Sequence, residues 1–208
     1  TKTGRKSDKF GVSIETAISL VKKCHDCSSL NLVGLTCHIG SQIMELKGFE
    51  DAARQALDLL FELDKLKIKI DFVDMGGGLG VNYIGEETIQ PFELIQSYEK
   101  IFAGRNERLI LEPGRSISAN AGILLTRVEY KKDNFIIANA AMNDLLRPAL
   151  YDAHHDIWTV MQNNSSSSSV NVVGPICETG DFLAKNINIA ASEGDLLAVK
   201  TVGAYGSV

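Results

Sequence analysis

The stretch "IDFVDMGGGLG" (residues 70–80) joins a short apolar run to a run of glycines, and it decides the fold class of the chain. Its first half has the length and the apolar content of a buried strand. Similar strands and amphipathic helices surround it. The strands are predicted at 32–39 and 108–113, and the helices at 14–26, 49–66 and 91–102. This alternation is typical of parallel strands joined by crossover helices, so the sequence predicts an α/β fold here.

The sequence pattern changes near residue 118. From there on, short runs of β-type residues are separated by turn residues, at 122–130, 135–140, 170–175, 186–190 and 195–202. Between the second and third runs, residues 142–157 predict a short helical insertion, and the serine tract 163–169 predicts a flexible surface loop. We therefore expect a second, mostly β domain from residue 119 onward.

Composition limits the classes of function. The net charge is −5 and the lysines and arginines are scattered, which argues against a nucleic-acid partner. No apolar run approaches the roughly 20 residues of a membrane span, and the first residues lack the apolar core of a signal peptide, so we expect a cytoplasmic protein without membrane contact. The four cysteines are too few for a disulfide framework. Cys24 and Cys27 are spaced as a metal or redox pair would be, but they lie at the end of a predicted helix and no second pair of ligands follows. We therefore expect no metal.

Each predicted parallel strand ends in residues that can bind a ligand. They are His38–Ser41 after the first strand, Gly76–Gly80 after the second and Glu112–Arg115 after the third. Because ligands bind at the carboxyl ends of parallel strands, these ends predict one shared site. A glycine run presents backbone N–H groups to an anion, although a purely structural turn explains such a run equally well.

Glu112 indicates the kind of ligand. Ser41 and Arg115 suit a phosphate, but a carboxylate that faces a phosphate repels it. The conflict resolves if the ligand has an anionic and a cationic end, as pyridoxal 5'-phosphate does. Backbone amides then bind the phosphate, and the carboxylate binds the protonated ring nitrogen. His38 can stack on that ring, and its alternative role is a hydrogen-bonded histidine at a strand end.

The segment "GPICETGD" (174–181) places the Cys177 thiol beside the Glu178 carboxylate in a turn-rich stretch. A thiol can donate a proton, and a carboxylate can bind an ammonium group. The alternative is an ordinary turn with a buried, inert cysteine.

Six segments, in this order, resemble the motifs of the diaminopimelate decarboxylases, which are fold-type III pyridoxal-phosphate decarboxylases. They are "CHIGSQI" (37–43), "DMGGGLG" (74–80), "LEPGRSISANAG" (111–122), "AAMNDLLRPALYDAHH" (140–155), "GPICETGDFLA" (174–184) and "GAYGS" (203–207). The resemblance implies an alanine-racemase-like (β/α)8 barrel followed by a C-terminal β domain. Residues 1–118 would be part of the pyridoxal-phosphate-binding barrel, and 119–208 would be the β domain, incomplete at its C-terminal end.

The resemblance also implies roles for individual residues. The cofactor-binding residues would be His38, Ser41, Gly78, Glu112, Pro113, Gly114, Arg115 and Tyr205. The substrate-binding residues would be Arg115, Arg147, Tyr151, Glu178 and Tyr205. Cys177 would be the catalytic proton donor. The implied reaction converts meso-2,6-diaminopimelate to L-lysine and CO₂ in a homodimer with shared active sites, with the cysteine loop reaching the partner's cofactor.

Arg147 favours this substrate over related ones. Diaminopimelate has a distal carboxylate that suits a guanidinium, whereas ornithine and lysine have none. The alternative for Arg147 and Tyr151, four residues apart, is a solvated helix face with a stacked pair. The alternative activity is a related decarboxylase acting on ornithine, arginine or carboxynorspermidine.

The sequence departs from the family at one important place. The family's cofactor-linked lysine lies in a tyrosine-alanine-x-lysine-type motif, and no such motif occurs in the 208 residues. The favoured explanation is that the N-terminal part of the barrel lies outside this chain. The alternative is a non-catalytic homologue that has lost the lysine and binds a partner.

Overall fold

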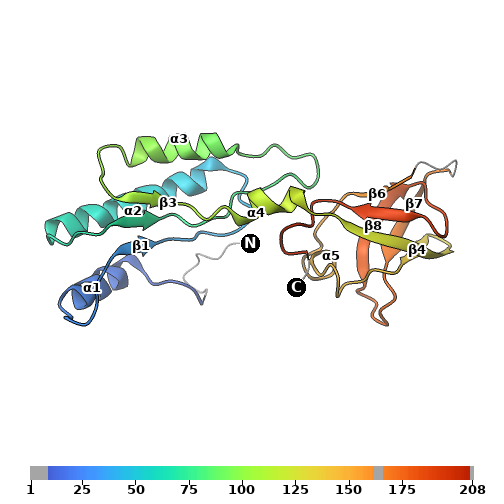
Figure 1. Ribbon diagram of the computed structural model, residues 1–208, viewed down its shortest axis with the longest axis horizontal. Helices are drawn as coiled ribbons and strands as arrows, with labels where there is room; N and C mark the ends of the chain where they lie inside the picture. Colours follow the sequence, from blue (N-terminus) through green and yellow to red (C-terminus); the bar gives the residue numbers. More distant parts are fainter. Residues whose placement is uncertain (1–8, 162–165, 207–208) are drawn as a thin grey trace. The chain divides into compact units, whose positions relative to one another are not determined.

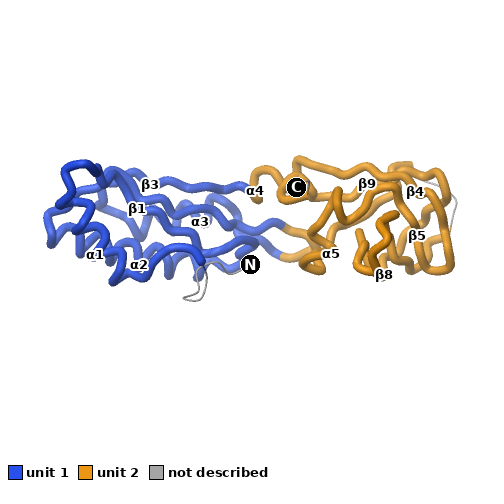
Figure 2. Tube along the Cα trace, turned by 90° about the horizontal axis from the view of Figure 1, so that it is seen from below, with its two compact units in different colours: residues 1–81, 87–114 blue, residues 82–86, 115–208 orange. Residues whose placement is uncertain are grey.

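The computed structural model describes residues 9–161 and 166–206 of the chain. The chain forms two compact units (Figure 2). Unit 1 comprises residues 1–81 and 87–114, and unit 2 comprises residues 82–86 and 115–208. The short segment 82–86, which follows the glycine run in the sequence, therefore belongs to the second unit.

Unit 1 is built around a parallel three-stranded sheet of order β1-β2-β3 (Figure 1). Its strands are β1 (Gly34–Thr36), β2 (Phe72–Asp74) and β3 (Arg108–Ile110), and its helices are α1 (Ile14–His25), α2 (Leu46–Lys65) and α3 (Pro91–Ile101). These elements match the predicted order. The strands are shorter than predicted: β1 and β2 begin two residues later, and all three end before the predicted residue.

Helix α2 shows why the apolar periodicity predicted this unit. Phe49, Ala53, Leu60 and Leu63 recur at helical spacing and are at most 1% exposed, so one face of α2 is fully buried. Helix α3 begins where Pro91 predicts, after the N-cap Gln90, whose backbone N–H donates to the Glu93 carboxylate at 2.7 Å.

Unit 2 is a six-stranded mixed sheet of order β6-β9-β4-β5-β7-β8. All neighbouring strands are antiparallel except β5 and β7, which are parallel. The strands are β4 (Leu124–Lys132), β5 (Phe135–Ala138), β6 (Ile157–Thr159), β7 (Ser168–Val173), β8 (Phe182–Ile189) and β9 (Leu196–Val199). Short helices α4 (Gly114–Ser118), η1 (Ala119–Ala121) and α5 (Arg147–Tyr151) accompany them, α4 beginning at the last residue of unit 1. A core that includes Ile136, Val172 and Leu197 fills this unit.

Unit 2 differs from the predictions in several details, and strand β8 begins at Phe182, four residues before the predicted run 186–190. The serine tract was predicted as a loop, but Ser168 and Ser169 begin β7 and pair with Ile189 and Asn188. Residues 163–165 lie outside the described part. The helical insertion is only five residues long: it begins at Arg147, and Asp152 ends it by adopting a left-handed conformation (φ 51°). Strand β6 was not predicted, since it has only three residues and depends on pairing with β9.

Candidate cofactor and substrate site

The glycine run of unit 1 is packed between the loops that follow β1 and β3. A Cβ added at Gly77 would overlap the backbone carbonyl oxygen of Glu112. A Cβ added at Gly78 would overlap the carbonyl oxygen of Gly40, and Gly78 also has a φ of +105°. The run therefore brings the three strand ends together, as the sequence predicted. The N–H groups of Gly76, Gly77 and Gly80 donate to Asp74, His38 and Ile43, so they are engaged within the protein.

His38 is fixed beside this run. The backbone N–H of Gly77 donates to His38 Nδ1 at 3.3 Å. Because Nδ1 accepts this hydrogen bond, the proton of the neutral imidazole is on Nε2. The side chain is solvent-exposed, which leaves its ring available for stacking on a ligand. His38 is thus a hydrogen-bonded strand-end histidine, and that contact orients its ring.

Gln42 connects the loop after β1 to the end of the glycine run by two hydrogen bonds. The sequence did not predict this role. Gln42 Nε2 donates to the carbonyl oxygen of Val81 at 2.6 Å, and the N–H of Val81 donates to Gln42 Oε1 at 3.2 Å. Gln42 itself has a φ of 59°. Its partner is 39 residues away, so no local pattern identifies it.

Unit 1 offers the donors and acceptors that pyridoxal phosphate requires. The N–H of Gly78 donates to no protein acceptor in the described part of the chain, and Gly78 is half-buried at the edge of the sheet. Among the same residues the exposed Glu112 carboxylate forms no ion pair. A free N–H suits a phosphate and a free carboxylate suits a protonated ring nitrogen, so these residues fit the cofactor.

The other predicted residues of unit 1 lie in the same two loops. Ser41 is half-buried and precedes Gln42 in the loop after β1. Pro113 follows Glu112, and the N–H of Gly114 donates to the Glu112 carbonyl oxygen at 2.9 Å in a tight turn. A Cβ at Gly114 would meet nothing within 4 Å, so the backbone is open there.

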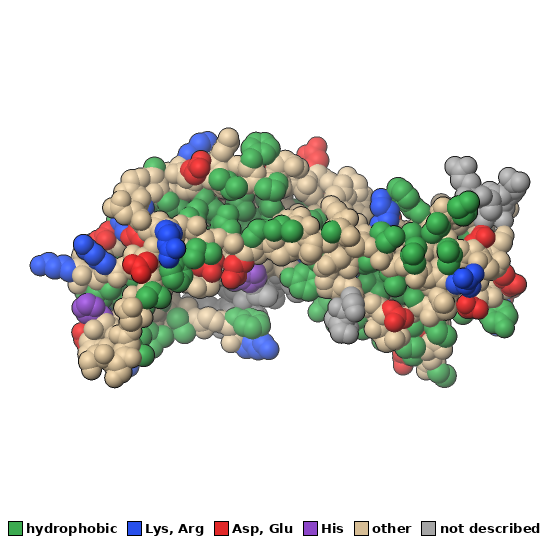
Figure 3. All heavy atoms as spheres, viewed as in Figure 1, with side chains coloured by type: hydrophobic (Ala, Val, Ile, Leu, Met, Phe, Trp, Pro, Cys, Tyr) green, Lys and Arg blue, Asp and Glu red, His purple; other side chains and the backbone are tan. Residues whose placement is uncertain are grey.

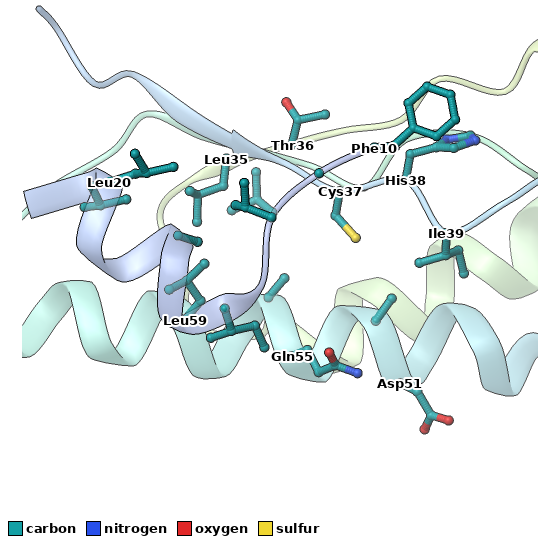
Figure 4. A pocket seen from close by; sticks show the side chains of 18 of the residues that line it. Phe10, Leu20, Leu35, Thr36, Cys37, His38, Ile39, Asp51, Gln55 and Leu59 are labelled. Atoms are coloured by element: carbon teal, nitrogen blue, oxygen red, sulfur yellow. The ribbon is translucent and has the colours of Figure 1, made fainter. Parts of the chain in front are cut away.

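A hollow of about 780 Å³ lies between α1, β1 and α2, and it is distinct from this edge (Figure 4). Its lining is mainly apolar, and Figure 4 shows the Cys37 thiol pointing into it toward α2, while the Asp51 carboxylate points away. Burial raises the pKa of Cys37, and the charge of Asp74 acts in the same direction. Among the described residues that line it, His38 is the one that the sequence predicted for the cofactor site.

In unit 2, Tyr83 contacts two of the predicted residues, Arg115 and Arg147, and Arg115 in turn contacts a third, Tyr205. Arg115 is 9% exposed, and its Nη1 donates to the Tyr83 hydroxyl at 2.8 Å. The Arg147 guanidinium carbon lies 4.7 Å from the centre of the Tyr83 ring. The Arg115 guanidinium carbon lies 4.6 Å from the centre of the Tyr205 ring. These distances indicate cation–π contacts, and they define a side-chain cluster that the sequence did not connect to Tyr83.

Arg147 is also held by His155, a residue that sequence reasoning missed. Arg147 Nη1 lies 2.7 Å from His155 Nε2, and His155 Nδ1 lies 2.9 Å from the carbonyl oxygen of Lys200. A guanidinium only donates and a carbonyl only accepts, so His155 is neutral with its proton on Nδ1. Burial lowers the pKa of His155 to about 4, which agrees with a neutral ring. Burial also lowers the pKa of Arg147, and the nearby charge of Arg115 adds to this effect.

The neighbouring Tyr151 interacts electrostatically with Arg147, which acts to raise the pKa of Arg147 against the larger effect of burial. The Tyr151 side chain is 64% exposed, one turn after Arg147 on α5. The aromatic ring under the Arg147 guanidinium is that of Tyr83, which comes from a distant part of the sequence. Arg147 is therefore half-buried against Tyr83 and does not lie on a fully solvated helix face.

Backbone geometry explains how Tyr205 reaches Arg115. The N–H of Gly203 donates to the carbonyl oxygen of Ala119 at 3.0 Å, and a Cβ at Gly203 would overlap the Ser118 carbonyl oxygen. This close crossing places the "GAYG" segment against the turn that follows Arg115. Tyr205 then adopts a φ of 57°.

The cysteine loop of unit 2 is exposed and is held by a buried aspartate. Asp181 is 3% exposed and accepts hydrogen bonds from the N–H groups of Met142 at 2.7 Å and Ile176 at 2.9 Å. Cys177 is exposed, so the alternative of a buried, inert cysteine is wrong. The N–H of Gly180 lowers the pKa of the exposed Glu178 carboxyl.

Metal sites, membrane-spanning helices and charged surface patches would each indicate another class of function. In the described ranges, no group of three or more His, Cys, Asp or Glu side chains is arranged to hold a metal ion. Among those residues, no helix is both long enough and apolar enough to cross a membrane. On the face drawn in Figure 3, the Lys and Arg side chains are interspersed with Asp and Glu.

Parallel β/α units with a free N–H and a free carboxylate at their strand ends, followed by a mixed sheet, define a cofactor-binding α/β plus β protein. The model of the family described as "Pyridoxal-dependent decarboxylase, pyridoxal binding domain" matches residues 1–119. The chain belongs to this family. Membership confirms the predicted fold class and the predicted cofactor.

Individual relatives narrow the resemblance. The chain is 47% identical to a diaminopimelate decarboxylase of Pseudomonas aeruginosa over 99% of its own length and 51% of that protein. It is 44% identical to a diaminopimelate decarboxylase of Neisseria meningitidis, over 99% of its own length and 52% of that protein. The crystal structure of the Helicobacter pylori diaminopimelate decarboxylase with L-lysine is 39% identical, with a TM-score of 0.95 over 99% of this chain and 52% of that one. The chain thus spans about half the length of these relatives.

Proposed function

We propose that the protein of which this chain is part decarboxylates meso-2,6-diaminopimelate to L-lysine and CO₂. The observation that carries this proposal is Arg147, a half-buried guanidinium that meets no carboxylate among the described residues. A buried cation without an acidic partner is costly unless a ligand supplies the anion. The similarity to diaminopimelate decarboxylases over nearly the whole chain supports a substrate with a distal carboxylate.

The cofactor would be bound mainly by unit 1. In this proposal the Gly78 N–H and Ser41 bind the phosphate, Glu112 binds the protonated ring nitrogen, and the His38 ring stacks on the cofactor. Residues further along the chain complete the contacts, namely Pro113, Gly114, Arg115 and Tyr205. When bound, pyridoxal phosphate supplies an electron sink for the carbanion that remains after CO₂ leaves.

The substrate would be selected by side chains of unit 2. Arg147 binds the distal carboxylate with the fork of its guanidinium, assisted by Tyr151 and Arg115. Glu178, whose pKa is lowered, stays ionised and binds the distal ammonium group. Tyr205 lies against Arg115 and lines the same side of the substrate.

Cys177 would supply the proton that replaces CO₂ at the α-carbon. After the α-carboxylate has left as CO₂, the thiol donates its proton from Sγ to the α-carbon, and the resulting thiolate is reprotonated from solvent. The exposed position of Cys177 on a loop anchored by Asp181 supports this role. We also propose a homodimer in which this loop acts at the partner's cofactor, a cytoplasmic location, and a barrel domain that ends near residue 118.

The direct test uses the full-length protein loaded with pyridoxal phosphate. We expect CO₂ release from meso-diaminopimelate with L-lysine as the product, and much slower release from L-ornithine and L-arginine. A protein that binds the cofactor but releases no CO₂ from diaminopimelate would contradict the proposal. A preference for ornithine or arginine would replace it with the related decarboxylase activity.

A further inference from the structure

We propose that His155 is a positioning residue that holds the Arg147 guanidinium in the orientation that selects a distal carboxylate. This inference rests on the proposed function and concerns the same substrate site. It assigns a role to a buried, neutral histidine that otherwise has none in the chemistry.

His155 is itself held rigidly. It lies two residues before the start of β6, which pairs with β9, and its Nδ1–H donates to the Lys200 carbonyl oxygen at 2.9 Å. The N–H of Lys200 in turn donates to the Asp156 carbonyl oxygen at 2.8 Å. The ring is 1% exposed, and the Tyr83 ring packs against it edge-on, with centroids 5.2 Å apart and planes at 80°. The imidazole therefore has one orientation, with Nε2 directed at Arg147.

This arrangement fixes Arg147 on two sides. His155 Nε2 accepts from Nη1 at 2.7 Å, and the Tyr83 ring covers a face of the guanidinium, 4.7 Å from its carbon. A guanidinium has five N–H donors in a planar fork, so a contact at one nitrogen and a ring on one face determine where the remaining donors point. Those donors are then preorganised for a planar acceptor such as a carboxylate.

The neutral charge of His155, the acceptor for Arg147, affects how strongly Arg147 attracts the distal carboxylate of a substrate. A carboxylate in place of His155 would hold Arg147 equally well, but it would neutralise the guanidinium and weaken its attraction for a substrate anion. The neutral imidazole restrains Arg147 without cancelling its charge. Tyr83 acts similarly, because its ring meets Arg147 and its hydroxyl accepts from Arg115.

The test compares two amide substitutions in the full-length, cofactor-loaded protein. Asn at position 155 can still donate to the Lys200 carbonyl, but it is too short to reach Arg147. Gln can reach Arg147 and accept its N–H. Competitive inhibition is measured with L-2-aminopimelate, which has a distal carboxylate, and with L-lysine, which has none. His154→Asn, a change at an exposed neighbouring histidine, is the matched control.

For His155→Asn we expect the inhibition constant of L-2-aminopimelate and the KM for diaminopimelate to rise about tenfold, with kcat and the inhibition constant of L-lysine within about twofold of wild type. His155→Gln should recover most of the loss, and His154→Asn should change nothing. Equal weakening of both ligands by His155→Asn, or no weakening of either, would overturn the inference. If His155→Asn does not fold, the test rests on His155→Gln. An inhibition constant for L-2-aminopimelate that is tenfold higher in His155→Gln than in wild type would then overturn the inference. Wild-type protein inactive on diaminopimelate would instead refute the proposed function.

Discussion

The strand-end edge of unit 1 and the arginine cluster of unit 2 are built in opposite ways. The edge is made of backbone: Gly77 and Gly78 are wedged between loops, and a peptide N–H is the free donor. The cluster is made of side chains from distant segments, with Tyr83 and His155 arranging Arg147. A backbone edge tolerates almost no added volume, whereas a side-chain cluster can lose selectivity while the fold persists. This difference suits a cofactor site that must be constant and a substrate site that must discriminate.

Adding a single methyl group should break the backbone edge completely. Gly77→Ala places a Cβ on the Glu112 carbonyl oxygen, so backbone must shift, at a cost of about 3–5 kcal/mol. We expect a large fall in Tm and loss of pyridoxal-phosphate binding, measured by calorimetry and by cofactor titration. Gly48→Ala is the control, because a Cβ there meets only ordinary contacts and Ala favours helix α2. Normal cofactor affinity in Gly77→Ala would show that the tight packing is not needed.

Removing the thiol should affect the chemical step alone. Cys177→Ala is expected to lower kcat by about 10²- to 10⁴-fold, with KM for diaminopimelate nearly unchanged, because proton donation is lost and binding is not. Steady-state kinetics measure kcat and KM of this variant. The control is Cys27→Ala, a change at another exposed cysteine. A kcat within twofold of wild type would assign the proton to another donor.

The neutral histidine of the cluster should make stability depend on pH. The unfolded chain takes up a proton on this imidazole as the pH falls through about 6.5, whereas in the folded protein the pKa of His155 is about 4. Stability is therefore complete above about pH 7 and falls by about 3 kcal/mol between pH 6.5 and 4. Tm is measured as a function of pH for the wild type and for His155→Gln. Over this pH range, the Tm of His155→Gln should fall less than that of the wild type. Parallel Tm curves for the two proteins would contradict a buried, neutral His155.

The smallest effect is expected at the side-chain clamp of unit 1. Gln42→Ala removes two hydrogen bonds to Val81 and should lower the free energy of unfolding by about 1–2 kcal/mol. Denaturant unfolding compares it with Gln55→Ala, a change at an exposed position of α2. Cofactor affinity should weaken only slightly, because the glycine contacts remain. An unaltered unfolding midpoint would show that the clamp is dispensable.

Sequence reasoning predicted what local patterns encode. The alternation of apolar runs predicted the three parallel strands and their helices, and the glycine run predicted that the strand ends meet. The order of unit 2 was predicted less completely. Strand β6 and the start of β7 depend on pairing with β9 and β8, which a local pattern of three residues or a serine tract does not show.

The residues that arrange the site were not predictable in the same way. Tyr83 contacts Arg115 and Arg147 from 32 and 64 positions away, and His155 binds a carbonyl 45 positions away. Nothing in the neighbourhood of Tyr83 distinguishes it from a surface tyrosine. A residue proposed to bind ligand, such as Arg147, can be recognised by its motif, whereas the residues that contact it are defined only by the fold.

The central claim is that Arg147 in unit 2 selects the substrate and unit 1 holds the cofactor. The most direct measurement is kcat/KM for meso-diaminopimelate in full-length Arg147→Ala, at saturating pyridoxal phosphate. The account predicts a loss of about 10²-fold or more relative to wild type, because the distal carboxylate loses its charged partner while the cofactor edge is untouched. A kcat/KM equal to that of wild type would contradict it.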